Sequence, residues 1–148
     1  MRIVLIRPPE RNDINTRLPE KINRAKGILP PLGIAYIASY LRKHGYDVSI
    51  LDCEALNLTA DDIKEHLFSL GNSLNWQPFI VGITCMTSNF PQALKIAAIA
   101  KYCGAITVMG GPHVVAYPDL DYMYSCVDYT IVGEGEDQIL ALVRYLDN

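Results

Sequence analysis

Two short glycine-rich segments are the part of this chain best suited to hold a large ligand. Gly-Gly-Pro-His stands at 110–113, directly after a run of apolar or β-branched residues at 106–109. Gly-Glu-Gly-Glu stands at 133–136, directly after a similar run at 129–132. Glycine carries no Cβ, so its backbone can lie close to something flat or bulky. Two such strand ends predict a ligand resting on one edge of a sheet.

Side chains that perform catalysis or bind metals show no comparable pattern. The four cysteines, at 53, 85, 103 and 126, lie 32, 18 and 23 positions apart, so neither a zinc site nor an iron–sulfur cluster is indicated. No Ser/His/Asp set or pair of carboxylates argues for hydrolysis. We therefore expect no catalytic residue and no metal ligand in this chain alone.

Strands and helices alternate along the chain. Short apolar runs predict strands at 2–7, 46–52, 79–84, 105–110 and 128–132. Helical patterns lie between them: from Pro31 to Gly45, after a capping threonine at 59, from Pro91 to Gly104, and over 139–146, with a weaker one at 114–127. Right-handed crossovers then give an α/β, Rossmann-like (flavodoxin-like) doubly wound sheet of five parallel strands, in the order 2-1-3-4-5. In such sheets ligands bind beyond the carboxyl ends of the strands.

Composition sets bounds on the partners. With 148 residues, of which 50% are hydrophobic, the chain fits one domain, and the net charge of −3 argues against binding nucleic acid. Residues 7–26 carry six basic and three acidic side chains, which predicts either a solvated loop or a lid for an anionic ligand. No signal peptide and no apolar stretch near 20 residues is visible, so we expect a cytoplasmic protein with reduced thiols and no membrane span.

Three common ligand classes of this fold are disfavoured by the loops. A phosphoacceptor domain needs acidic residues after strand 1, an aspartate after strand 3 and a lysine after strand 5; here stand Arg-Pro-Pro, Thr-Cys-Met and Gly-Glu-Gly. A flavin phosphate loop needs free amides after strand 1, which the prolines at 8 and 9 do not supply. The dinucleotide pattern G-x-G-x-x-G is absent from the first turn.

Several segments, in this order and spacing, resemble the cobalamin-binding domain of B12-dependent radical S-adenosylmethionine enzymes. They are Arg-Pro-Pro at 7–9, Pro-Pro-Leu-Gly-Ile-Ala-Tyr at 30–36, Leu-Arg-Lys-His-Gly-Tyr-Asp-Val at 41–48, Val-Gly-Ile-Thr at 81–84, Gly-Gly-Pro-His at 110–113 with Pro118, and Gly-Glu-Gly-Glu at 133–136. The resemblance covers nearly the whole chain. It implies that residues 1–148 are the N-terminal, cofactor-holding part of a longer protein. A C-terminal barrel with a 4Fe–4S cluster and S-adenosylmethionine would then perform methyl transfer or ring formation.

The resemblance also implies a set of cofactor-binding residues. These are Pro8, Thr84, Met86, Thr87, Gly110, Gly111, Pro112, His113, Gly133, Glu134 and Gly135. Thr84 could hydrogen-bond the cofactor's nucleotide tail or cap a loop amide, and Met86 could contact the ligand or fill the core. His113 could lie near the corrin or bond to its own loop. Glu134 and Glu136 suit the start of a helix in any case. Valine at Gly110 or Gly111 is expected to abolish binding and leave the fold intact.

One element of other cobalamin domains is missing. Methyltransferases and mutases carry Asp-x-His-x-x-Gly after strand 1, with the histidine ligating cobalt, whereas this chain has no histidine before His44. The resemblance therefore implies a base-off cobalamin without a histidine lower ligand. The alternatives are a corrin-free protein-interaction or regulatory domain and an FMN-binding electron-transfer domain of the same fold.

Overall fold

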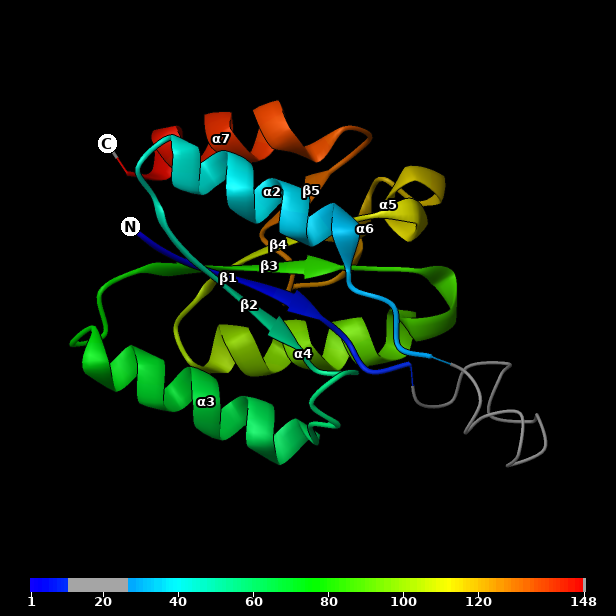
Figure 1. Ribbon diagram of the computed structural model, residues 1–148, viewed down its shortest axis with the longest axis horizontal. Coiled ribbons are helices and arrows are strands. Elements are labelled where there is room, and N and C mark those ends of the chain that lie inside the picture. Colours follow the sequence, from blue (N-terminus) through cyan, green and yellow to red (C-terminus); the bar gives the residue numbers. More distant parts are fainter. Residues whose placement is uncertain (11–26, 148) are drawn as a thin grey trace.

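The chain folds into a five-stranded parallel sheet between two layers of helices (Figure 1). In the computed structural model residues 1–10 and 27–147 are described. The strands are β1 (Arg2–Arg7), β2 (Asp47–Asp52), β3 (Phe79–Thr84), β4 (Ile106–Gly110) and β5 (Tyr129–Ile131). They lie in the order β2-β1-β3-β4-β5, and every neighbouring pair is parallel. The predicted topology is confirmed.

The strands are apolar along their length because both faces of the sheet are covered. On β1, Val4 and Ile6 belong to one buried cluster, and Ile3 and Leu5 belong to the other. Successive side chains of a strand point to opposite faces, so a strand covered on both faces needs a continuous apolar run.

Long helices cover both faces of the sheet. The helices α2 (Leu32–Lys43) and α7 (Gly135–Leu146) bury Ile34, Ala38, Leu41, Ile139, Leu140 and Val143 in one cluster. On the opposite face lie α3 (Ala60–Ser73) and α4 (Phe90–Tyr102), as Figure 1 shows. Helix α3 begins at the predicted Thr59, whose side chain and Asp62 form a reciprocal capping box.

The fourth crossover differs from its prediction. The single short helix expected within 114–127 is replaced by two, α5 (Pro112–Ala116) and α6 (Leu120–Met123). Helix α5 begins earlier than expected because Pro112 occupies its first turn, where a proline needs no N–H partner. A further 3-10 turn, η2 (Thr87–Asn89), follows β3.

The parallel order places the loops after β1, β3, β4 and β5 at one edge of the sheet, its carboxyl edge. Both termini lie near the opposite edge (Figure 1). Most of the basic segment 7–26, expected as a solvated loop or lid, falls at 11–26, outside the described residues. Within the described ranges, no helix is long and apolar enough to cross a membrane.

Candidate functional site

A cavity of about 280 Å³ opens at the carboxyl edge, on the face covered by α2 and α7. We call it the slot. Its floor includes Leu5, Gly82 and Val108, three residues that lie side by side on β1, β3 and β4. Its walls come from the start of α2, from the start of α7 and from β5. The lining is mainly apolar, as in sites that take a flat organic ligand.

Glycines form an unusual share of this lining. Six of the chain's ten line the slot: Gly33, Gly82, Gly110, Gly111, Gly133 and Gly135. A Cβ on Gly33 would meet no atom within 4 Å, and a Cβ on Gly110 would make only ordinary contacts with Ile131, at 3.6 Å or more. Neither glycine is therefore required by the packing of the protein itself: Gly33 faces open space, and Gly110 has room for at least a Cβ. The slot therefore has the form of a cradle that side chains would fill.

Gly111 has a different role, which corrects the expectation that valine would be tolerated there. Its φ is +108°, and an added Cβ would lie 2.8 Å from the carbonyl oxygen and 2.9 Å from the amide nitrogen of Cys85. A side chain at this position would therefore displace the backbone after β3. A variant at Gly111 cannot separate a loss of binding from a disturbance of the fold.

The loops after β3 and β4 are joined by backbone hydrogen bonds. The amide of Cys85 donates to the carbonyl of Gly110 (2.7 Å), and the amide of His113 donates to the carbonyl of Cys85 (3.1 Å). The amide of Met86 donates to the side-chain carbonyl of Asn89 (2.9 Å). These bonds hold the edge of the slot next to Thr84 and Gly111 in one arrangement.

His113 lies inside an aromatic cluster and is not part of the slot lining. Its ring centroid is 4.1 Å from that of Phe90 and 4.9 Å from that of Tyr117, and only 6% of the residue is exposed. Its Nδ1 lies 3.1 Å from the hydroxyl of Thr87. Burial lowers the pKa of His113 below its usual value of 6.5, because the charged ring would lose its hydration.

This shift predicts a pH dependence of stability. At pH 7 the ring is mainly neutral in both states, but as the pH falls through about 6.5 the unfolded chain takes up a proton that the folded chain resists. The free energy of unfolding should therefore fall from pH 7 to pH 5, with a contribution of at most about 1.4 kcal/mol per pH unit from this one group.

Urea unfolding at both pH values should show that the free energy of unfolding depends less on pH in His113→Phe. His66→Gln, on the exposed surface of α3, is the control and should behave as the parent; equal pH dependence in all three proteins would refute this.

The loop after β5 leads into α7 through Glu134. This residue precedes the helix, and Glu136 lies in its first turn, where the helix dipole stabilises a carboxylate. Gln138 donates to the carbonyls of Val132 (2.7 Å) and Glu134 (3.1 Å), which fixes the loop beside the slot. Both glutamates also line the slot.

The structure brings most, but not all, of the predicted cofactor-binding residues together. Those that line the slot are Thr84, Gly110, Gly111, Pro112, Gly133, Glu134 and Gly135. Pro8 is buried beyond the end of β1, Met86 is half exposed on the loop after β3, and Thr87 and His113 contact each other. These four do not line the slot.

Sequence reasoning missed the floor and one wall of the slot. Gly82 lies in the middle of a strand, where glycine usually marks a close approach, and its added Cβ would lie 2.7 Å from Cδ2 of Leu5. Gly33 lies near the start of a helix, one turn before Ile37, which also lines the slot. In both cases, a glycine inside a strand or helix was the sequence signal that could have identified the site residue.

Two cysteines follow strands at this edge, Cys53 after β2 and Cys85 after β3. Burial raises the pKa of the Cys53 and Cys85 thiols to about 12, which makes both poor nucleophiles at neutral pH. Among the described residues there is no group of three or more His, Cys, Asp or Glu side chains placed to hold a metal ion.

The fold and the slot together define a parallel α/β domain with a cavity at the carboxyl edge of its sheet. Residues 22–143 match the B12 binding domain family, and the chain belongs to this family. A crystal structure of the N-terminal domain of a hypothetical protein of Thermotoga maritima has the same fold. That structure matches with a TM-score of 0.52 and 21% identity, over 80% of this chain and 92% of that one.

Several longer proteins contain a similar stretch. The chain is 38% identical, over 149 residues, to an uncharacterized methyltransferase of Pyrococcus horikoshii, covering 99% of this chain and 29% of that protein. It is 34% identical to the anaerobic magnesium-protoporphyrin IX monomethyl ester cyclase of Rubrivivax gelatinosus, covering 82% of this chain and 21% of the cyclase. It is 30% identical to the cytidylyl-2-hydroxyethylphosphonate methyltransferase of Streptomyces wedmorensis, covering 79% and 24%. The chain thus spans less than a third of each relative.

Proposed function

We propose that this chain binds a cobalamin, with the nucleotide tail of the cofactor in the slot. The observation that carries the proposal is the slot itself: an apolar cavity at the carboxyl edge, lined by six glycines, in a member of the B12 binding domain family. When bound, cobalamin supplies a cobalt ion that can accept and donate a methyl group.

The residues present fit the dimethylbenzimidazole base, which is the flat, apolar part of the tail. The aliphatic side chains of Leu5, Val108 and Ile139 offer van der Waals contacts on the floor and wall of the slot. Gly33 and Gly110 leave the space that a ring would need. Thr84, at the end of β3, carries a hydroxyl at the edge of the slot that can donate a hydrogen bond to a polar atom of the tail.

We further propose that the bound cobalamin is base-off, because its tail would lie in the slot and away from the cobalt, and that no histidine of this chain takes the place of the base. The chain has three histidines. His44 follows α2 and His66 lies on α3, and neither lines the slot. Nδ1 of the buried His113 is held by Thr87. A ligating histidine would have to leave one of these positions.

The activity of the whole protein is a proposal of the same kind. We infer that residues 1–148 are a cytoplasmic, N-terminal cofactor domain of a B12-dependent radical S-adenosylmethionine enzyme. Its downstream barrel would hold a 4Fe–4S cluster and S-adenosylmethionine and would transfer a methyl group or close a ring. The support is the extent of the relatives, two of which are named methyltransferases and one a cyclase.

Visible absorbance and electron paramagnetic resonance test this proposal. The purified domain, titrated with hydroxocobalamin, should bind it at one site with a change in the corrin spectrum. The reduced Co(II) form should show cobalt lines without the triplet splitting that an axial nitrogen causes. FMN binding in place of cobalamin, or no binding of either, would support the flavin or interaction-domain alternative. Triplet splitting lost in His113→Ala would show that His113 ligates the cobalt, and splitting kept in this variant would point to the cofactor's own base as the ligand; either result would overturn the assignment.

A further inference from the structure

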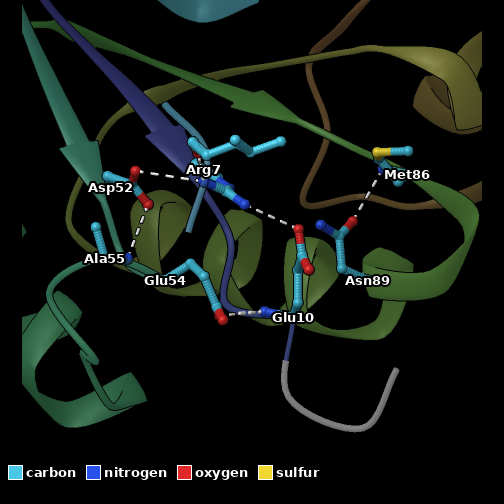
Figure 2. Close-up of polar contacts among 8 residues, drawn as sticks. Arg7, Glu10, Asp52, Glu54, Ala55, Met86 and Asn89 are labelled. Atoms are coloured by element: carbon cyan, nitrogen blue, oxygen red, sulfur yellow. Dashed lines mark hydrogen bonds and ion pairs between the residues drawn. The ribbon is translucent and has the colours of Figure 1, made fainter. Parts of the chain in front are cut away.

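Arg7 is the centre of a polar cluster at the carboxyl end of β1, next to the slot but outside its lining. Its guanidinium donates to Oε1 of Glu10 at 2.9 Å and pairs with Oδ2 of Asp52 at 3.5 Å. Only 14% of the Arg7 side chain is exposed. Figure 2 shows the guanidinium between these two carboxylates, one from the loop after β1 and the other from the end of β2.

The same guanidinium also reaches the segment that leads into α2. Nη1 of Arg7 donates to the backbone carbonyl of Leu29 at 2.7 Å. On the other side of the cluster, the amide of Glu10 donates to Oε2 of Glu54 at 2.7 Å (Figure 2). The Arg7 side chain therefore joins three positions that are distant from one another in sequence: 10, 29 and 52.

The bond to Leu29 lies two residues before Pro31, the residue that precedes α2. The carbonyls of Pro30 and Pro31 accept from the amides of Leu32 and Ala35, so the approach to the helix is continuous with its first turn. That first turn carries Gly33, a wall of the slot. A displacement at Leu29 would consequently be transmitted to the slot wall.

From these contacts we propose that Arg7 is a positioning residue for cofactor binding, which fixes the α2 wall of the slot by holding Leu29 against the end of β1. The inference rests on the proposed cobalamin site. Arginine suits this position because its planar fork presents several donors in fixed directions and can bond two carboxylates and a carbonyl at once. A lysine ammonium at the end of a flexible chain would keep the charge but not this geometry.

The chain offers a matched control on the same strand. Arg2, at the amino end of β1, pairs with Asp47, the register partner at the start of β2, as Arg7 pairs with Asp52 at its end. Arg2 lies at the opposite end of the sheet from Leu29 and the slot mouth. Removing either arginine breaks a β1–β2 ion pair, but only the loss of Arg7 releases the approach to α2.

Two measurements on Arg7→Met, Arg7→Lys and Arg2→Met test the inference. Hydrogen exchange of the cofactor-free domain should show the amides of Leu32 and Ala35 exchanging at least tenfold faster in Arg7→Met than in Arg2→Met. Stopped-flow release of hydroxocobalamin should be at least tenfold faster in Arg7→Met, intermediate in Arg7→Lys and unchanged in Arg2→Met. The rates are compared with each protein held at the same interval below its own urea unfolding midpoint. If Arg7→Met does not fold, Arg7→Lys against Arg2→Met decides.

The outcomes test the positioning role of Arg7 and the proposed cobalamin site separately. Equal exchange at Leu32 and Ala35 in the Arg7 and Arg2 variants overturns the positioning role, whether or not the parent binds cobalamin. Faster exchange with equal release rates also overturns it, because the wall would then not matter to the ligand. A parent that binds no cobalamin contradicts the proposed function, and the role of Arg7 in cofactor binding falls with it.

Discussion

Replacing Gly33 with tryptophan should weaken cobalamin binding by at least a hundredfold and leave the fold intact. A Cβ at this position meets no atom within 4 Å, and Gly33 lies one turn before Ile37, so both share the side of α2 that lines the slot. An indole there would take the space proposed for the nucleotide tail. Burying about 150 Å² of a planar ring contributes roughly 4 kcal/mol, so excluding it should cost about that much.

The stability of this variant should not fall. Gly33 is the second residue of α2, so the gain in helix propensity is at most the roughly 1 kcal/mol of a helix interior, and the larger residue also restricts the unfolded chain. Ser39→Trp is the matched control, because Ser39 is exposed on another side of the same helix. Titration with hydroxocobalamin, together with urea unfolding, compares the three proteins. Parent-like affinity in Gly33→Trp would mean that the ligand lies elsewhere, whereas equal losses in both variants would point to a general effect of tryptophan on α2.

The topology could be predicted from the sequence because each strand leaves two independent signals. A continuous apolar run predicts a strand covered on both faces, and glycine or a capping residue marks where the intervening helix begins or ends. Gly45 and Gly104 both follow their helices at positive φ, and Thr59 caps α3 as its sequence predicts. The fourth crossover had no such signal and was predicted only as one short helix.

The edge of the slot could be predicted, but its floor could not. The glycines at 110–111 and 133–135 stand at strand ends, and a parallel sheet brings strand ends together. The floor depends on register: Leu5, Gly82 and Val108 become neighbours only when β1, β3 and β4 align. A single sequence carries no direct information on this alignment.

Adjacent residues of the Gly-Gly-Pro-His motif have different roles in the structure. Gly110 lines the slot and has room for a Cβ in ordinary contact with Ile131, whereas a Cβ on Gly111 would clash with the backbone of Cys85. In the same way, Thr87 and His113 bond to each other and stay outside the slot lining. The motif marks the place of the site, and only the packing of the two loops separates ligand contacts from structural contacts.

The central claim is that the slot holds the nucleotide tail, and a comparison of cobalamin with cobinamide tests it most directly. Cobinamide keeps the corrin and the cobalt but lacks the tail, so it forfeits the contacts with Leu5, Val108 and Ile139. By the same burial of a planar ring, the parent domain should bind cobalamin at least a hundredfold more tightly. In Gly33→Trp the two affinities should become equal, because no tail can enter. Equal affinities already in the parent would contradict the account, since the slot would then contribute nothing to holding the cofactor.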